Sequence, residues 1–339
     1  MTEMLTTWLR IVEQSRARPM ADTVPITNFV TPLADLGLIA ATGDDAATFL
    51  HNQLTNDVEH LGLAEARLAG YCSPKGRLLA TMMMWKTPDA IMLQLSGDIQ
   101  QGVQKRLQMF VLRAKAKLAD VSDQHAVLGL AGPAAAILLS KWFPSMPATP
   151  YAVTESPAGT LIRCVDSASG PRYQWITSHA MAAEAWDELA GVLTVSSARA
   201  WRVAEISAGL PQVAQSTQDQ FVPQMINFEV IGGVNFKKGC YPGQEIVARS
   251  QYLGKLKRRM YIATVDSIDA RPGMDVFASG DPQQPCGMLV NAEVVSPNQA
   301  LCLVEVKSAA LEGGTIHLGS ASGPALRFTP LPYELIDVT

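Results

Sequence analysis

The chain has 339 residues, of which 48% are hydrophobic and 17% are charged, and its formal net charge is −4. This length exceeds the usual span of one compact core, so we expect two or three domains. The acidic balance excludes a protein that binds nucleic acid through positive charge over its whole surface. Any RNA contact would need a local basic patch.

Cysteine usage and hydropathy indicate the compartment. The five cysteines, at positions 72, 164, 240, 286 and 302, form no Cys-x-x-Cys pair and show no zinc-type spacing with histidine, which is typical of reduced thiols in a cytosol. No apolar run reaches the roughly 18 residues that a membrane-spanning helix needs. The start of the chain lacks the apolar core and cleavage site of a signal peptide. The sequence therefore predicts a soluble, cytoplasmic protein.

The first third of the chain predicts an antiparallel sheet backed by helices. A lead helix within residues 1–18 precedes a strand at 36–41, and Thr42-Gly43-Asp44-Asp45 provides acidic caps for a helix at 46–54. Strands at 67–72 and 77–86 form a hairpin around the turn Ser73-Pro74-Lys75-Gly76. A strand at 90–95, an amphipathic helix at 98–113 and a strand at 115–121 complete the unit.

The next third follows a similar logic. We expect a strand at 126–130, a helix from Pro133 to Trp142, strands at 160–165 and 173–176, and a helix at 179–189. Four prolines predict a loop over 144–157. Ser196 or Ser197 caps a helix at 199–208, which Gly209 ends. From Arg259 onward, short alternating runs punctuated by glycine and proline predict a small antiparallel barrel.

Polar chemistry is concentrated in the segment 234–249. It contains Lys238-Gly239-Cys240-Tyr241-Pro242-Gly243-Gln244-Glu245, which is called the Lys238–Glu245 motif below. Pro242-Gly243 predicts a tight turn, and the residues from Gln244 onward open a helix. A turn that carries a cation, a thiol and an acceptor-rich pair is expected to form one wall of a site.

This motif resembles the signature of the YgfZ family of folate-binding proteins, which are relatives of the glycine cleavage T-protein, an aminomethyltransferase. The resemblance continues upstream in Phe221-Val222-Pro223-Gln224 and Asn227, and downstream in the basic run at 255–259. It implies an α+β fold in which T-protein-like antiparallel sheets and helices surround a central cavity, with a small C-terminal β-barrel. The expected domains are an N-terminal α+β unit at 1–122, a second α+β unit at 123–254 that carries the motif, and the barrel at 255–339.

The resemblance also implies a function. The chain is expected to bind tetrahydrofolate or another folate, and to support the synthesis or repair of iron–sulfur enzymes, including those that thiolate tRNA. The family is further described as tRNA-modifying and as regulatory in replication initiation. The expected partners are therefore a folate and iron–sulfur enzymes, with no membrane. Direct tRNA contact through the basic residues Arg249, Lys255, Lys257, Arg258 and Arg259 is the weaker alternative, because such clusters are more often a solvated face.

Trp201 stands where family members carry a folate-contacting tryptophan, and its flat indole suits stacking on a pterin or aminobenzoyl ring. Lys238 is expected to bind the folate carboxylate tail or a nucleic-acid phosphate. The predicted folate-binding residues are Leu36, Trp201, Asn227, Lys238, Gly239, Tyr241, Gly243, Gln244, Glu245 and Arg249. No metal ligand is predicted.

Three features depart from the pattern of the T-protein and its relatives. Ala80-Thr81 takes the place of an acidic residue after the first hairpin turn, and neither side chain can accept a proton from an amine, so the classical aminomethyl transfer is not expected. Ser207 stands in place of a glutamate that pairs with the pterin ring. Glu205, two positions away, would point about 200° round the helix and cannot simply substitute. Leu36 replaces an aromatic wall.

Two alternatives stay open beside the folate-linked helper. One is a folate-dependent one-carbon transferase that uses Asp57 or Glu205 as its acid. The other is a scaffold that docks client proteins without folate. Cys240 is either a reactive, catalytic thiol favoured as thiolate by Lys237 and Lys238, or a small packed residue. The spacing of the five histidines identifies no base for it, and a cluster shared with a partner through Cys240 also stays open.

Overall fold

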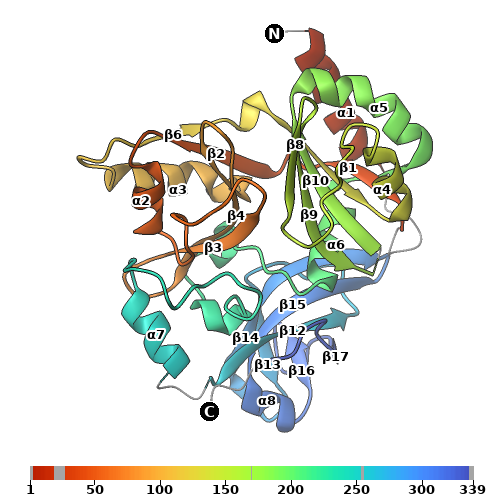
Figure 1. Cartoon of the computed structure of the whole chain (residues 1–339). Helices are drawn as coiled ribbons and strands as arrows, with labels where there is room; N and C mark the ends of the chain where they lie inside the picture. Colours follow the sequence, from red (N-terminus) through yellow and green to blue (C-terminus); the bar gives the residue numbers. More distant parts are fainter. Residues whose placement is uncertain (1–2, 19–26, 169, 253–255, 336–339) are drawn as a thin grey trace.

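The computed structural model describes residues 3–18, 27–168, 170–252 and 256–335, and they form three sheets that appear as three lobes in Figure 1. The predicted α+β class is confirmed. Within these ranges, every helix is too short or too polar to cross a bilayer. The boundary expected between residues 254 and 255 lies outside the described residues, and the division into 1–122, 123–254 and 255–339 stays a prediction.

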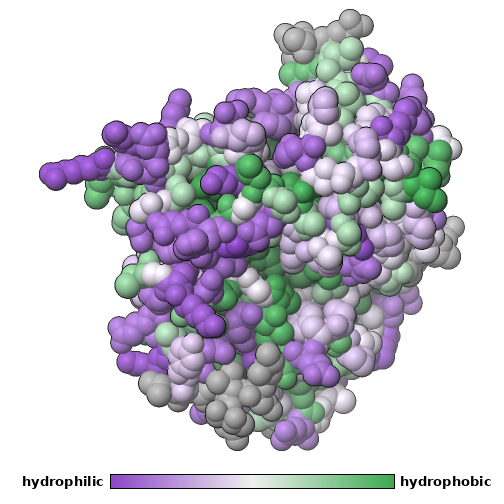
Figure 2. Space-filling view, in the orientation of Figure 1, coloured by the Kyte–Doolittle hydropathy of each residue, from purple (hydrophilic) through white to green (hydrophobic). Residues whose placement is uncertain are grey.

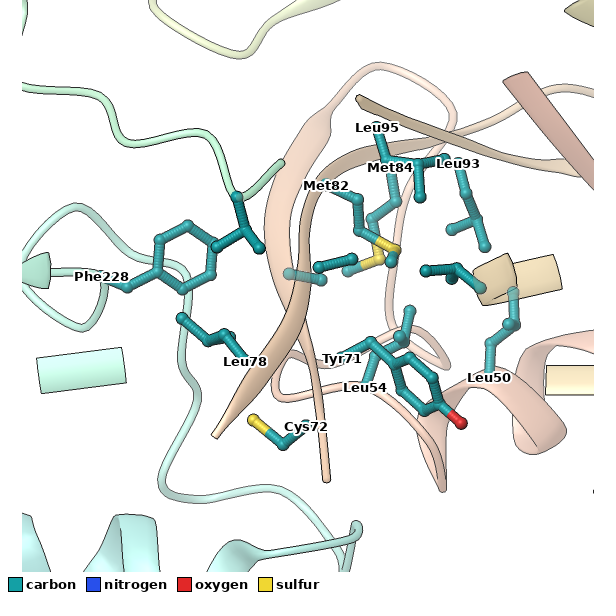
Figure 3. Close-up of a cluster of buried hydrophobic side chains, with 14 of the residues drawn as sticks. Leu50, Leu54, Tyr71, Cys72, Leu78, Met82, Met84, Leu93, Leu95 and Phe228 are labelled. Atoms are coloured by element: carbon teal, nitrogen blue, oxygen red, sulfur yellow. The ribbon is translucent and has the colours of Figure 1, made fainter. Parts of the chain in front are cut away.

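The first sheet has five antiparallel strands in the order β3-β4-β5-β2-β6. Its side chains pack against α2 and α3, and Figure 3 shows Leu50, Leu54, Tyr71, Met84 and Leu93 converging in this core. The elements are β2 (Leu36–Thr42), α2 (Ala46–His51), β3 (Ala66–Cys72), β4 (Leu78–Lys86), β5 (Ile91–Ser96), α3 (Gly97–Met109) and β6 (Lys117–Asp120).

Two expectations about the helices of this unit are wrong. Helix α3 ends at Met109 instead of reaching 113, because Phe110 caps it and Leu112 turns the chain with a positive φ of 43°. Asp45 precedes α2 but its side chain makes no cap bond. Its Oδ2 instead accepts a hydrogen bond of 2.7 Å from the Lys115 amide, which ties the start of α2 to the segment before β6.

The second sheet has six strands in the order β11-β1-β7-β10-β9-β8. Helices α1 and α5 lie side by side on it (Figure 1), with Trp8 stacked on His179 at 6.1 Å between ring centres. The chain's first helix and first strand thus lie with this sheet. The elements are α1 (Glu3–Arg16), β1 (Phe29–Pro32), η1 (Ser122–Gln124), β7 (Ala126–Ala131), α4 (Pro133–Leu139), β8 (Val153–Ser156), β9 (Gly159–Ser167), β10 (Gly170–Thr177), α5 (His179–Val192) and β11 (Thr194–Val195).

Strand β8 corrects the loop that was predicted over residues 144–157. The four residues Val153–Ser156 pair antiparallel with β9. The prolines of the segment, at positions 144, 147, 150 and 157, lie outside the strand, so they interrupt no ladder bond. Val153 is buried and anchors the strand.

The third sheet confirms the predicted C-terminal barrel-like unit. Its six strands run in the order β16-β13-β14-β15-β12-β17, and the sheet curls so that its edges meet at a bridge between His317 and Ala325. The elements are β12 (Arg258–Val265), β13 (Asp275–Ala278), β14 (Asp281–Ser296), β15 (Gln299–Lys307), α8 (Ser308–Glu312), β16 (Ile316–Leu318) and β17 (Leu326–Thr329). In chain order, α6 (Ala198–Ser207), η2 (Gln215–Thr217), η3 (Pro223–Ile226) and α7 (Gln244–Tyr252) follow the strands of the second sheet and precede those of the third.

Helix α6 lies where the three sheets meet. Trp201 packs so closely on β7 that a Cβ at Gly129 would lie 2.6 Å from Trp201 Cε3, so glycine at this strand position admits the indole. The next residue of the helix, Arg202, donates hydrogen bonds to Asp35, which directly precedes β2 of the first sheet, and to Glu293 of β14. The helix is therefore fixed against all three sheets.

Candidate functional site

A cavity of about 920 Å³ lies between the three sheets. This volume is at the upper end of that of pockets for drug-sized ligands. Figure 2 shows apolar surface in the hollow between the lobes, within a largely hydrophilic rim. The lining comes mainly from β2, β4, β5, α6 and β14, and includes Leu36, Thr81, Gln94, Tyr151, Gln174, Trp201, Arg202, Glu205 and Asn291.

Trp201 and Leu36, two of the residues predicted to bind folate, line this cavity. Trp201 is only 4% exposed, and the guanidinium carbon of Arg172 lies 4.7 Å from its ring centre. Arg172 projects from β10 and is fully buried. Its Nε donates to Val165 O at 2.8 Å and its Nη1 donates to Glu205 Oε1. The cation thus fixes the indole on one side and a carboxylate on the other.

Four buried polar atoms in or beside the cavity wall have no hydrogen-bond partner among the described residues. They are Gln94 Nε2, Tyr151 OH, Arg172 Nη2 and Gln174 Oε1. Three belong to lining residues, and the fourth belongs to Arg172, which contacts the lining residues Trp201 and Glu205. Leaving a buried polar group unsatisfied costs about 1–3 kcal/mol, so four around one space indicate a place for a polar ligand or bound water. Burial raises the pKa of the Tyr151 hydroxyl, which therefore stays a neutral donor.

Tyr151 is also held in an unusual backbone conformation, with a φ of 65°. A non-glycine residue in the left-handed region costs about 1–3 kcal/mol, and such residues gather at ligand sites. The sequence reasoning missed Gln94, Tyr151, Arg172 and Gln174. A signal was present for Gln94, because it interrupts the apolar strand Ile91–Ser96.

Glu205 and Ser207 lie on different sides of α6. Glu205 lines the cavity and Ser207 does not, because the Ser207 hydroxyl donates to Val203 O at 2.8 Å within the helix. The carboxylate of this helix therefore reaches the cavity from position 205. Thr81 lines the cavity as well, and its hydroxyl accepts from the Val213 amide at 2.9 Å.

Lys238 lies outside the lining of this cavity. Its Nζ donates to His51 O and, at 2.9 Å, to Leu54 O, just past the end of α2, and it lies 4.9 Å from the ring centre of Tyr241. Burial lowers the pKa of Lys238 to about 8. A cation bonded to the last carbonyls of a helix stabilises its C-terminus.

The two glycine turns of the sequence analysis pack against each other. Gly76 ends the first hairpin turn with a φ of 69°, and Gly243 in the motif has a φ of 78°. A Cβ on Gly243 would lie 2.4 Å from Ser73 O and 2.6 Å from Gly76 Cα. Both positions need glycine because of the positive φ and the close approach, so the motif is fixed to the first sheet.

The other predicted site residues also lie outside the cavity lining. Asn227, buried and left-handed, donates from Nδ2 to Met260 O at 2.8 Å and so links η3 to β12. Glu245 and Arg249 pair with each other at 3.2 Å on the exposed side of α7. Gly239 lies beside the imidazole of His51, Tyr241 is buried, Gln244 begins α7, and Cys240 is exposed.

Carboxylates neutralise part of the basic cluster downstream of the motif. Arg258 pairs with Glu305 at 2.8 Å, and Arg259 pairs with Glu229 at 2.5 Å. Lys255 lies outside the described residues. Within the described ranges, no group of three or more His, Cys, Asp or Glu side chains is arranged to hold a metal ion.

Comparison with known proteins shows which proteins this chain is similar to. Residues 30–161 match the GCVT N-terminal domain model. The structure superposes on the glycine cleavage system aminomethyltransferase T of Bartonella henselae with a TM-score of 0.72 and 16% identity, covering 97% of this chain and 89% of that one. The fold is therefore that of the T-protein-like class.

Similarity in sequence narrows the class. The chain is 29% identical over 326 residues to the tRNA-modifying protein YgfZ of Photorhabdus laumondii, covering 94% of this chain and 97% of that protein. It is 28% identical over 315 residues to the tRNA-modifying protein YgfZ of Escherichia coli strain SMS-3-5, covering 92% and 94%. The chain is similar to the YgfZ proteins over most of its length, which confirms the resemblance predicted from the Lys238–Glu245 motif.

Proposed function

We propose that this protein binds a reduced folate, tetrahydrofolate, in the central cavity, and that it acts in tRNA modification by supporting iron–sulfur enzymes that thiolate tRNA. The observation that carries the folate part is the set of unpartnered buried atoms of Gln94, Tyr151, Arg172 and Gln174 beside Trp201. They offer donors and an acceptor next to a flat aromatic face, which is the combination that a pterin ring requires.

The carboxylate of Glu205 supports the same ligand. Its Oε1 accepts from Arg172, and the side chain is 30% exposed where it lines the cavity. A pterin carries an amino group and a ring N–H side by side, and a carboxylate accepts from such a pair in a bidentate fashion. Glu205 can therefore take the role of the glutamate that relatives carry at the position of Ser207, although it reaches the ligand from a different side of α6.

The rim of the cavity suits the other end of a folate. Arg199, Arg202 and Arg271 line it. Arg199 and Arg202 are already paired with Glu293 and Asp35, whereas Arg271 donates to backbone carbonyls, and its guanidinium suits a carboxylate such as that of a glutamate tail. The ammonium of Lys238 already donates hydrogen bonds to the carbonyls at the end of α2. We therefore assign the folate tail to Arg271 and not to the motif lysine.

The tRNA part of the proposal rests on the relatives, which are named tRNA-modifying proteins. Arg258 and Arg259 are paired with carboxylates, which does not favour the basic cluster as an RNA surface. We therefore place the protein beside the thiolating enzymes and not on tRNA itself. The link to iron–sulfur enzymes comes from the sequence resemblance.

Calorimetric titration with tetrahydrofolate tests the folate part. Saturable binding is expected for the unmodified protein. Gln174→Leu should weaken it by about tenfold, because a ligand N–H that donates to Gln174 Oε1 would then face an apolar wall without an acceptor. Gln101→Leu, an exposed glutamine of α3 outside the lining, is the matched control and should bind normally. Absence of binding to the unmodified protein would refute the folate part.

Thiolated nucleosides in tRNA test the second part. Cells that lack this protein should contain less thiolated tRNA, and the unmodified protein should restore the level. Gln174→Leu, expressed to the same level, should restore it less well if folate is needed for the role. Unchanged thiolation in cells without the protein would refute the tRNA part while leaving folate binding intact.

A further inference from the structure

A second polar cluster lies around Cys240, apart from the lining of the folate cavity. It consists of Cys240 and Lys238 from the motif, His51 at the end of α2, and Asp57 in the segment after α2. Cys240 is the exposed cysteine, whereas the four at 72, 164, 286 and 302 are buried. The sequence could not show that His51 lies near Cys240, because 189 positions (240 − 51) separate the two residues.

His51 is oriented by a carboxylate. Its Nδ1 lies 3.1 Å from Asp57 Oδ1, and the other carboxylate oxygen lies 2.8 Å from His60 Nδ1. Burial would raise the pKa of Asp57, but the hydrogen bonds and charges of His60 and His51 hold it below its usual value. A carboxylate at this distance accepts a hydrogen bond from Nδ1–H, which favours the tautomer in which Nε2 presents a lone pair.

That lone pair faces the motif. His51 is 8% exposed, and its Nε2 lies 3.5 Å from the position that a Cβ on Gly239 would occupy. Among the described residues, Nε2 has no hydrogen-bond partner. Gly239 directly precedes Cys240, so the absence of a side chain there leaves room between the imidazole and the cysteine backbone. Lys238 interacts electrostatically with both Cys240 and Asp57.

We propose that Cys240, His51 and Asp57 form a thiol-exchange site that reacts with a small anionic disulfide of the glutathione disulfide type. His51 Nε2 accepts the thiol proton, Asp57 is a positioning residue, and the exposed Lys237 attracts the anionic groups of the disulfide. This site is independent of folate, so its failure and the failure of the proposed function are separable.

The exchange step conserves atoms and electrons. The Cys240 thiolate attacks one sulfur of the disulfide, forming a new bond between Cys240 Sγ and that sulfur while the original S–S bond breaks. The second sulfur leaves as a thiolate and takes the proton from His51. Cys240 is oxidised to a mixed disulfide and the leaving half of the disulfide is reduced. Attack by a second small thiol reverses the modification.

The test is the rate at which the native protein reacts with glutathione disulfide, followed by the mass increase of one glutathione per chain. One rapidly modified cysteine is expected, and Cys240→Ser should remove it. His51→Gln should slow the reaction at about pH 7 by roughly tenfold, and should move the rate–pH profile to higher pH, because the thiol loses its base. His317→Gln in β16 is the matched control: this histidine bonds Thr315 and Gly323 instead of Asp57, and the variant should react like the unmodified protein.

A second variant keeps the proposal falsifiable if His51→Gln does not fold. Asp57→Asn preserves the shape of the positioning residue but not its charge, and it should slow the reaction in the same direction. Folded variants at position 51 or 57 that react at the rate and with the pH profile of the unmodified protein would overturn the proposal. Modification that persists in Cys240→Ser would overturn it as well, because a buried cysteine would then be the reacting thiol.

Discussion

The guanidinium of Arg172 lies 4.7 Å from the ring centre of Trp201, with no exposure to solvent. A buried cation held by an indole face and by Glu205 joins β10 of the second sheet to α6. Since α6 also contacts the first and third sheets, this pair couples the shape of the cavity to the packing of the whole chain.

Replacing Arg172 by methionine should destabilise the fold. The change removes the cation–π contact and the pair with Glu205, and losing one partner of a buried charge pair costs about 3–5 kcal/mol. Because Glu205 is partly exposed, we expect a loss near the lower end. Urea unfolding measures it. The double variant Arg172→Met, Glu205→Gln should recover part of the loss, and a double variant as unstable as the sum of the singles would contradict the coupling.

Replacing Gly243 by alanine should be among the most damaging small changes in the motif. Its φ of 78° disfavours alanine, and the new Cβ would approach Ser73 O to 2.4 Å. We expect the free energy of unfolding to fall by about 2 kcal/mol or more. Gly102→Ala in α3 is the control, since no atom lies within 4 Å of its Cβ position. That change should be neutral or stabilising by up to about 1 kcal/mol, and equal effects at both glycines would count against the packing of the two turns.

The lowered pKa of Lys238 predicts how the stability of the protein changes with pH. Its pKa falls from 10.5 to about 8 because of burial, so between these values the unfolded chain binds a proton that the folded chain has lost. The stability linked to this group is present above pH 10.5 and is lost as the pH falls through about 8. The free energy of unfolding of the unmodified protein, relative to Lys238→Met, should therefore rise with pH across this window. A constant difference would contradict a lowered pKa.

Periodicity and punctuation in the sequence predicted most of the fold. The strands of the first sheet and the helix α7 follow from alternation, turn residues and the Pro242-Gly243 signal, and the curled third sheet follows from its short alternating runs. The predictions that failed depend on tertiary contacts. Strand β8 forms because β9 offers an edge, and α3 ends early because Leu112 turns the chain.

The candidate site was less predictable for the same reason. Trp201 and Leu36 could be placed by resemblance, and both line the cavity. Gln94, Gln174 and Arg172 come from strands of two different sheets, and only the folded chain brings them together. Lys238 was expected to bind the folate tail, but a sequence cannot show that the carbonyls at the end of α2 bond its ammonium.

We propose above all that folate binds in the cavity lined by Trp201 and not at the Lys238–Glu245 motif. Calorimetric titration of tetrahydrofolate into Trp201→Ala and Lys238→Ala, each first shown to be folded by circular dichroism, tests it most directly. We predict that Trp201→Ala binds at least about tenfold more weakly than the unmodified protein, since aromatic stacking on a base-like ring contributes about 1–3 kcal/mol. Lys238→Ala should retain the affinity of the unmodified protein. Normal binding by Trp201→Ala together with loss of binding by Lys238→Ala would contradict the account and place the ligand at the motif.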